Sequence, residues 1–235
     1  MWEEITEPAQ TVPQAIQTTR SVVWTEELLA QADLLCAAAR ECSRRGWVPA
    51  TSGNFSFRDA ETGRIFISAS GFDKGLITPN DLLEIDVACR VLAAPADPGK
   101  GKPSAETKLH GVIYRDRPQT GAIFHVHTIW NTLLSDRYAA QGAVPLENYE
   151  LLKALSGVTT HEHREQVPIL ENSQEYNGLS KELAAALANY PGAHGVLLRR
   201  HGLYTWGESI AGARRHLEAL EFLFEVEWRR LGSAS

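Results

Sequence analysis

The 235-residue sequence predicts a layered α/β domain with a mixed, largely antiparallel sheet. Amphipathic helical segments are interspersed with short apolar strand segments along the chain, which is the pattern of a layered α/β protein. Several strand segments are separated only by short turns, and such hairpins pair antiparallel. No repeat or long linker divides the chain, and its length suits one domain. We therefore expect a single domain over residues 21–235, preceded by a loose, acidic, proline-containing extension over residues 1–20.

The expected helices are recognised by apolar residues at helical spacing and by residues that suit helix ends. The first is the clearest, because Thr25 can cap its start and Gly46 can end it. Thr78 with Pro79, and later Ser104, supply similar start signals. In chain order, the expected helices occupy residues 25–46, 78–86, 104–117, 128–138, 146–155, 179–189 and 209–231.

The expected strands are short and apolar, and GAIFHVH at 121–127 is typical of a buried one. The clearest loop is residues 96–104, which are rich in Gly, Pro and Lys. In chain order, the expected strands occupy residues 55–57, 64–68, 121–127, 167–170, 195–202 and 203–206.

Composition excludes several classes of function. The net charge is −6 and no segment concentrates Lys and Arg, so we expect no nucleic-acid partner. No apolar run is long enough to cross a membrane, and the acidic start lacks the features of a secretion signal. The three cysteines, an odd number at no metal-ligand spacing, fit a reducing compartment, and Cys36 lies in an apolar helical run. The expected location is the cytoplasm.

Two histidines at the end of a strand indicate a metal site. Alternation along a strand places His125 and His127 on one face, about 7 Å apart along the chain. Zinc favours nitrogen ligands, and a catalytic zinc keeps three protein ligands and one open position. His201 also ends an apolar run before a turn and is the best third ligand. His161 and His163 have the same spacing, but their polar surroundings favour a solvated loop.

Each of these histidines could instead be an ordinary hydrogen-bonded residue of the core or surface. The isolated histidines, for which a structural role is the simplest interpretation, are His110, His194 and His216.

Two polar turns and one helix start offer an anion site. Exposed backbone N–H groups in Gly/Ser turns, and at a helix N-terminus, bind anions, although most such turns are only turns. The residues concerned are Thr51, Ser52, Gly53, Asn54, Ser70, Gly71, Lys74 and Ser104.

Together these motifs resemble the class II aldolase family, in which they occur in the same order. They are TSGNFS at 51–56, SASG at 68–71, KPSAET at 102–107, HVHT at 125–128 and RRHG at 199–202. The resemblance covers residues 25–230 and implies a three-layer α/β/α fold. It also implies one zinc ion per chain on the three histidines, and a homotetramer with active sites between neighbouring subunits. The substrate would be a phosphorylated ketose, with its phosphate on the Ser/Gly/Asn turns.

Within the family, the chain resembles the dehydratases of methionine salvage, which remove water from a methylthio-substituted ketose phosphate. The resemblance implies that Glu150 is the acid/base, with Lys153 one turn later as a substrate ligand. Glu106 matches the catalytic glutamate of the aldolases, and its role here stays open between a base, a metal-site neighbour and a substrate ligand. The segments that carry this resemblance are WVPATSGN at 47–54, KPSAET at 102–107, ELLKAL at 150–155, VPILEN at 167–172 and RRHGLYTWG at 199–207.

Two other functions remain open at this stage. One is retro-aldol cleavage or epimerisation of a sugar phosphate on the same metal site, as in fuculose-phosphate aldolase. The other is a non-enzymatic interaction module like the adducin head, which need not keep metal ligands.

Overall fold

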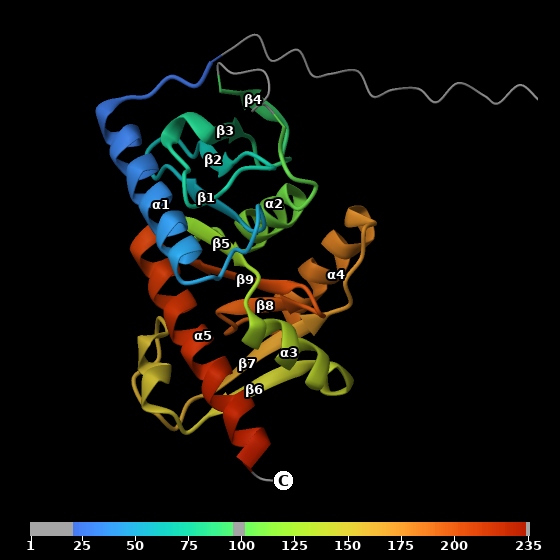
Figure 1. Cartoon of the computed structure of the whole chain (residues 1–235). Helices are drawn as coiled ribbons and strands as arrows, with labels where there is room; N and C mark the ends of the chain where they lie inside the picture. The colour runs from blue at the N-terminus through green and yellow to red at the C-terminus, as the bar shows by residue number, and fades with distance from the viewer. Residues whose placement is uncertain (1–20, 96–101, 234–235) are drawn as a thin grey trace, which may run out of the picture.

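The computed structural model describes residues 21–95 and 102–233 (Figure 1). The expected extension over residues 1–20 and most of the expected loop at 96–104 therefore lie outside the described residues. Within the described residues, nine strands form one sheet in the order β4-β3-β2-β1-β5-β9-β8-β7-β6. Only β7 and β8 pair in parallel, and the other neighbours are antiparallel. The mixed, mainly antiparallel sheet predicted from the sequence is confirmed.

The strands are short, and most are buried on both faces. They are β1 (Asn54–Arg58), β2 (Ile65–Ser68), β3 (Leu82–Ile85), β4 (Val91–Ala93), β5 (Ala122–Val126), β6 (Ala143–Glu147), β7 (Arg164–Leu170), β8 (Gly195–Leu198) and β9 (Gly202–Gly207).

The helices cover both faces of the sheet. They are α1 (Glu26–Arg44), α2 (Thr107–Asp116), α3 (Ile129–Arg137), α4 (Tyr176–Asn189) and α5 (Ile210–Ser233), with short 3₁₀ turns η1 (Pro79–Asp81), η3 (Ala139–Gln141) and η4 (Glu150–Ala154). One apolar core lies between the sheet and α1, α3 and α5, and a second lies between the sheet and α2 and α4 (Figure 1). This is the predicted three-layer α/β/α arrangement. None of the helices in the described ranges is both long and apolar enough to span a lipid bilayer.

Two predicted helices were wrong. Residues 78–86 form a single 3₁₀ turn, η1, followed by strand β3. The capping signal is real, because Asp81 accepts hydrogen bonds from the backbone and side chain of Thr78. Pairing with β2 then overrides the helical preference of the residues that follow.

Residues 146–155 likewise hold the end of β6 and the turn η4 instead of one helix. Pro145 lies within β6, where it is tolerated because β6 is an edge strand.

The helix expected from Ser104 begins instead at Thr107. Residues 104–106 form a turn in which the Thr107 N–H donates to the Ser104 carbonyl oxygen at 3.1 Å. Glu106 consequently stands directly before the helix, and its side chain is free to point away from the helix axis.

Candidate active site

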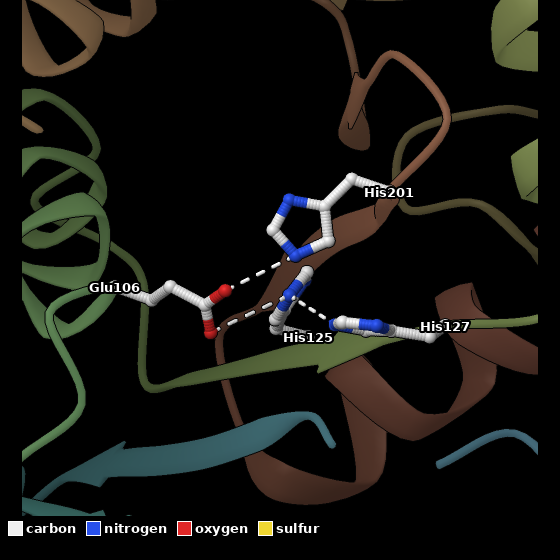
Figure 2. A group of neighbouring side chains, drawn as sticks. All are labelled: Glu106, His125, His127 and His201. Atoms are coloured by element: carbon white, nitrogen blue, oxygen red, sulfur yellow. Dashed lines mark hydrogen bonds and ion pairs between the residues drawn. The ribbon is translucent and has the colours of Figure 1, made fainter. Parts of the chain in front are cut away.

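Three histidines and one glutamate from separate parts of the chain meet at one point (Figure 2). His125 lies in β5, His127 directly follows that strand, and His201 lies in the turn between β8 and β9. Glu106 reaches them from the start of α2. One potential ligand atom of each residue lies within 4.8 Å of the others. The sheet is what joins them, because β9 pairs with β5 and brings the turn at His201 beside the histidine pair.

The contacts within the cluster are short. Nε2 of His127 lies 2.8 Å from Nε2 of His125. The two carboxylate oxygens of Glu106 lie 3.0 Å from Nε2 of His201 and 3.7 Å from Nε2 of His125. The His125 side chain is fully buried, and those of His201 and Glu106 are only 12% and 16% exposed.

Hydrogen bonds on the far side of two rings fix which nitrogen faces the cluster. Nδ1 of His125 donates to the carbonyl oxygen of Leu203 at 3.0 Å, so Nε2 of the neutral ring carries a lone pair. Nδ1 of His201 lies 3.1 Å from the side-chain oxygen of Asn172. Such partners commonly hold metal-binding histidines in the required tautomer.

These lone pairs and the Glu106 carboxylate face one another as acceptors. Hydrogen-bond acceptors at such distances repel each other unless a cation lies between them. As metal ligands, three imidazoles and one carboxylate suit a divalent transition metal. The residues present therefore fit the metal ion that the sequence predicts.

The electrostatics of the cluster agree with this. Burial, together with neighbouring charges, lowers the pKa of His125 well below its ordinary value and the pKa of His127 to about 4. Both rings are therefore neutral near pH 7, which is the form that binds metal. Burial acts to raise the pKa of Glu106, but its close contact with His201 and the nearby histidine rings outweigh burial and hold that pKa well below its usual range.

Gly202 leaves the room that the rings need. A Cβ at this position would lie 2.4 Å from the carbonyl oxygen of Val126, 2.9 Å from the ring of His125 and 3.1 Å from the ring of His127. We expect Gly202→Ala to displace both rings and to lower the affinity for a divalent metal ion about tenfold or more, measured by competition with a chelator. Gly192→Ala is the matched control, because a Cβ there meets nothing within 4 Å. Equal metal affinity in the two variants would contradict this account of Gly202.

The predicted anion-binding residues gather in one pocket beside the cluster. Its volume is about 100 Å³. The Ser52 hydroxyl is buried without a hydrogen-bond partner, so it is available to a ligand. The pocket is lined by Thr51, Ser52, Gly53, Asn54, Ala69, Ser70, Gly71, Lys74, Ser104, Glu106 and His127.

Lys74 adds a buried positive charge to this pocket. Its Nζ donates to the carbonyl oxygens of Thr51 and Phe72 at 3.2 and 2.9 Å. Burial lowers the pKa of Lys74 to about 8, so the ammonium group is still largely charged at neutral pH. The sequence placed Lys74 in an anion-binding loop but gave no reason to rank it above the serines.

Glu150 and Lys153 do not lie in this pocket. They form an ion pair with each other on the exposed turn η4, and Glu150 lies 3.9 Å from the ring of His161. The catalytic role of Glu150 and the substrate role of Lys153 therefore remain predictions that require a second subunit.

Among the described residues, the rival pair, His161 and His163, does not belong to any group of side chains that could hold a metal ion. His163 instead contacts the buried carboxylate of Glu165 at 3.0 Å.

Comparison with known proteins identifies the family. The family model of the class II aldolase and adducin N-terminal domain matches residues 33–228. A methylthioribulose-1-phosphate dehydratase of Methylococcus capsulatus is 47% identical, over 84% of this chain and 93% of its own. One of Stenotrophomonas maltophilia is 45% identical, over 85% and 92%.

A solved structure agrees in fold. The L-fuculose-1-phosphate aldolase of Thermus thermophilus superposes with a TM-score of 0.65 over 90% of this chain and 100% of its own, at 24% identity. The match to the family model and the two relatives show that the chain belongs to the class II aldolase family.

Proposed function

We propose that the chain is a zinc-dependent methylthioribulose-1-phosphate dehydratase of methionine salvage that works in the cytoplasm. The reaction removes water from 5-methylthioribulose 1-phosphate and leaves 5-methylthio-2,3-dioxopentyl phosphate. Four relatives at 41–47% identity carry the name of this dehydratase. The observation in the structure that best supports the proposal is the cluster of His125, His127, His201 and Glu106, which lies next to a pocket whose lining includes serine and glycine. A non-enzymatic module would have no need of such a cluster.

The three histidines would hold the zinc ion. Their rings would supply the three nitrogen ligands of a catalytic zinc, and those of His125 and His127 are neutral near pH 7. When bound, the ion would act as a Lewis acid that polarises the substrate carbonyl group. Glu106 adjoins the ligands and is ionised, so it either completes the ligand set, contacts the substrate or accepts a proton.

The pocket would hold the phosphate group of the substrate. Ser52 offers a free hydroxyl, Ser70 and Ser104 line the same space, and Lys74 supplies positive charge. Substrate phosphate would then lie beside the cluster, so that the carbon chain of the ketose reaches the metal-binding residues.

The phosphate assignment predicts the effect of a negative charge in the pocket. We expect Ser70→Asp and Ser104→Asp each to raise KM at least about tenfold, because a carboxylate would stand where the phosphate must lie. Steady-state kinetics would measure KM, and the zinc content of both variants should match that of the parent protein. Failure of inorganic phosphate to inhibit the parent protein competitively would show that the site is misplaced.

Proton transfer requires one more group. Dehydration takes a proton from C3 and must protonate the hydroxyl group that leaves C4, because hydroxide is a poor leaving group. We assign this work to Glu150 of a neighbouring subunit in a homotetramer, with Lys153 beside it as a substrate ligand. Their exposure on η4 is compatible with such an interface.

The reaction can be tested against the main alternative by its products. We expect the zinc-loaded protein to convert methylthioribulose 1-phosphate into the diketo phosphate, and to release no dihydroxyacetone phosphate from fuculose 1-phosphate. The opposite pair of results would assign the chain to the aldolases and would overturn the proposal.

A further inference from the structure

A continuous line of buried hydrogen bonds runs away from Glu106 into the protein. Nδ2 of Asn54 donates to Glu106 at 2.6 Å, and Oδ1 of Asn54 lies 2.5 Å from Nε2 of His110. Nδ1 of His110 lies 2.7 Å from the hydroxyl of Ser56, which lies 2.8 Å from the hydroxyl of Tyr114. Asn54, Ser56, His110 and Tyr114 are each at most 3% exposed.

The line arises where one face of a helix meets one face of a strand. His110 and Tyr114 are four residues apart on α2, and Glu106 stands four residues before His110. Asn54 and Ser56 are two apart on β1, so their side chains share a face of the sheet. The five side chains therefore alternate between the helix and the strand.

The chemistry of the groups fixes the direction of every hydrogen bond. An ionised Glu106 only accepts, so the amide N–H of Asn54 must face it and Oδ1 must face His110. Nε2 of His110 must then carry the proton, and Nδ1 must accept. The Ser56 hydroxyl consequently donates to Nδ1 and accepts from the hydroxyl of Tyr114. Every donor in the line points towards Glu106.

We propose that His110 is a positioning residue for the metal site: its Nε2–H fixes the amide of Asn54, which in turn holds the carboxylate of Glu106 against the histidine cluster. The inference rests on the proposed function, because it gives Glu106 a defined place in that site. Asn54 alone would not suffice, since its amide could rotate and present its oxygen to Glu106.

The neutral state of His110 agrees with this arrangement. The ring is fully buried, and burial lowers the pKa of His110 to about 3, although Glu106 opposes the shift. A neutral ring has one donor and one acceptor, which is what the two neighbours of His110 require.

The line could also be no more than a set of buried polar groups that satisfy one another, and a matched pair of substitutions distinguishes the two cases. Glutamine can place an N–H near the position of Nε2, whereas the shorter asparagine reaches only the position of Nδ1. Both variants lose the ring, so a purely structural role predicts similar defects in both.

We expect His110→Gln to keep kcat within about threefold of the parent, and His110→Asn to lose about 10- to 100-fold, the range usual for residues that support metal ligands. Zinc content should match in the two variants, because the three ligand histidines are intact. Equal kcat values in the two variants, high or low, would overturn the proposal.

A second measurement covers the case in which a variant does not fold. Nitrogen-15 NMR of the histidine rings in the zinc-loaded parent protein distinguishes N–H from lone-pair nitrogens. We expect His110 to show the Nε2–H tautomer without change from about pH 5 to about pH 9. The Nδ1–H tautomer, or a doubly protonated ring, would overturn the proposal. The NMR measurement does not depend on enzymatic activity. A parent protein that shows the expected tautomer but no activity would therefore contradict the proposed function and not the role of His110.

Discussion

Replacing His201 by alanine is expected to remove the metal ion and to abolish turnover. The variant loses one of the three proposed nitrogen ligands, and the remaining pair, His125 and His127, cannot hold zinc in a catalytic arrangement. The carboxylate of Glu106 also loses its contact at 3.0 Å. We expect kcat to fall by at least about 10³-fold, and metal analysis of the purified protein to give well under one zinc ion per chain.

The control for this substitution is His161→Ala. His161 belongs to the rival histidine pair, and its exposed side chain lies 3.9 Å from the carboxylate of Glu150. Its loss should leave zinc content unchanged. Full zinc occupancy and activity in His201→Ala, or loss of zinc in His161→Ala, would contradict the assignment of the ligands.

Glu150→Gln is expected to lower kcat by about 10² to 10⁴, the usual contribution of a general acid–base group. Glutamine keeps the size and polarity of the side chain but cannot carry a proton. Zinc content and KM should change little, because neither depends on the transferred proton. If Glu150→Gln stays within about tenfold of the parent, the proton transfer belongs to Glu106, whose glutamine variant should then show the loss.

The position of Glu150 also predicts that two inactive proteins can restore each other. A His201→Ala subunit keeps Glu150, and a Glu150→Gln subunit keeps the three histidines. In a mixed tetramer, an intact site forms wherever the histidines of a Glu150→Gln subunit face the Glu150 of a His201→Ala neighbour. Subunits exchanged in equal amounts should regain about a quarter of the parental activity per chain, given random assembly in a cyclic tetramer. No recovery after proven subunit exchange would show that the site does not lie between subunits.

The histidine pair could be predicted from sequence because its geometry is local. A strand has a period of two, so His125 and His127 share a face wherever the strand lies. The position of His201 beside this pair is not a local property, since it depends on the pairing of β9 with β5. The family motifs supplied that information, and spacing alone could only rank His201 as the best of several candidates.

The errors in the fold have the same origin. Thr78, Pro79 and Asp81 give a correct signal for a turn of helix, but no local feature shows that the next four residues pair with β2. The line behind Glu106 was missed for a related reason. In the sequence His110 is an isolated histidine, because its partners come from β1, more than fifty residues earlier. Glutamate, histidine and tyrosine at intervals of four, beside Asn54 and Ser56 at an interval of two, are the signal that could have revealed it.

The most direct test of the proposed function is the metal dependence of product formation. The parent protein would be stripped with a chelator, titrated with zinc and incubated with methylthioribulose 1-phosphate, and the product would be identified by phosphorus and carbon NMR. We expect no product without metal, and formation of the diketo phosphate that rises with zinc and levels off at one ion per chain. Full activity of the stripped protein, or a product in which the five-carbon skeleton is split, would contradict the proposal.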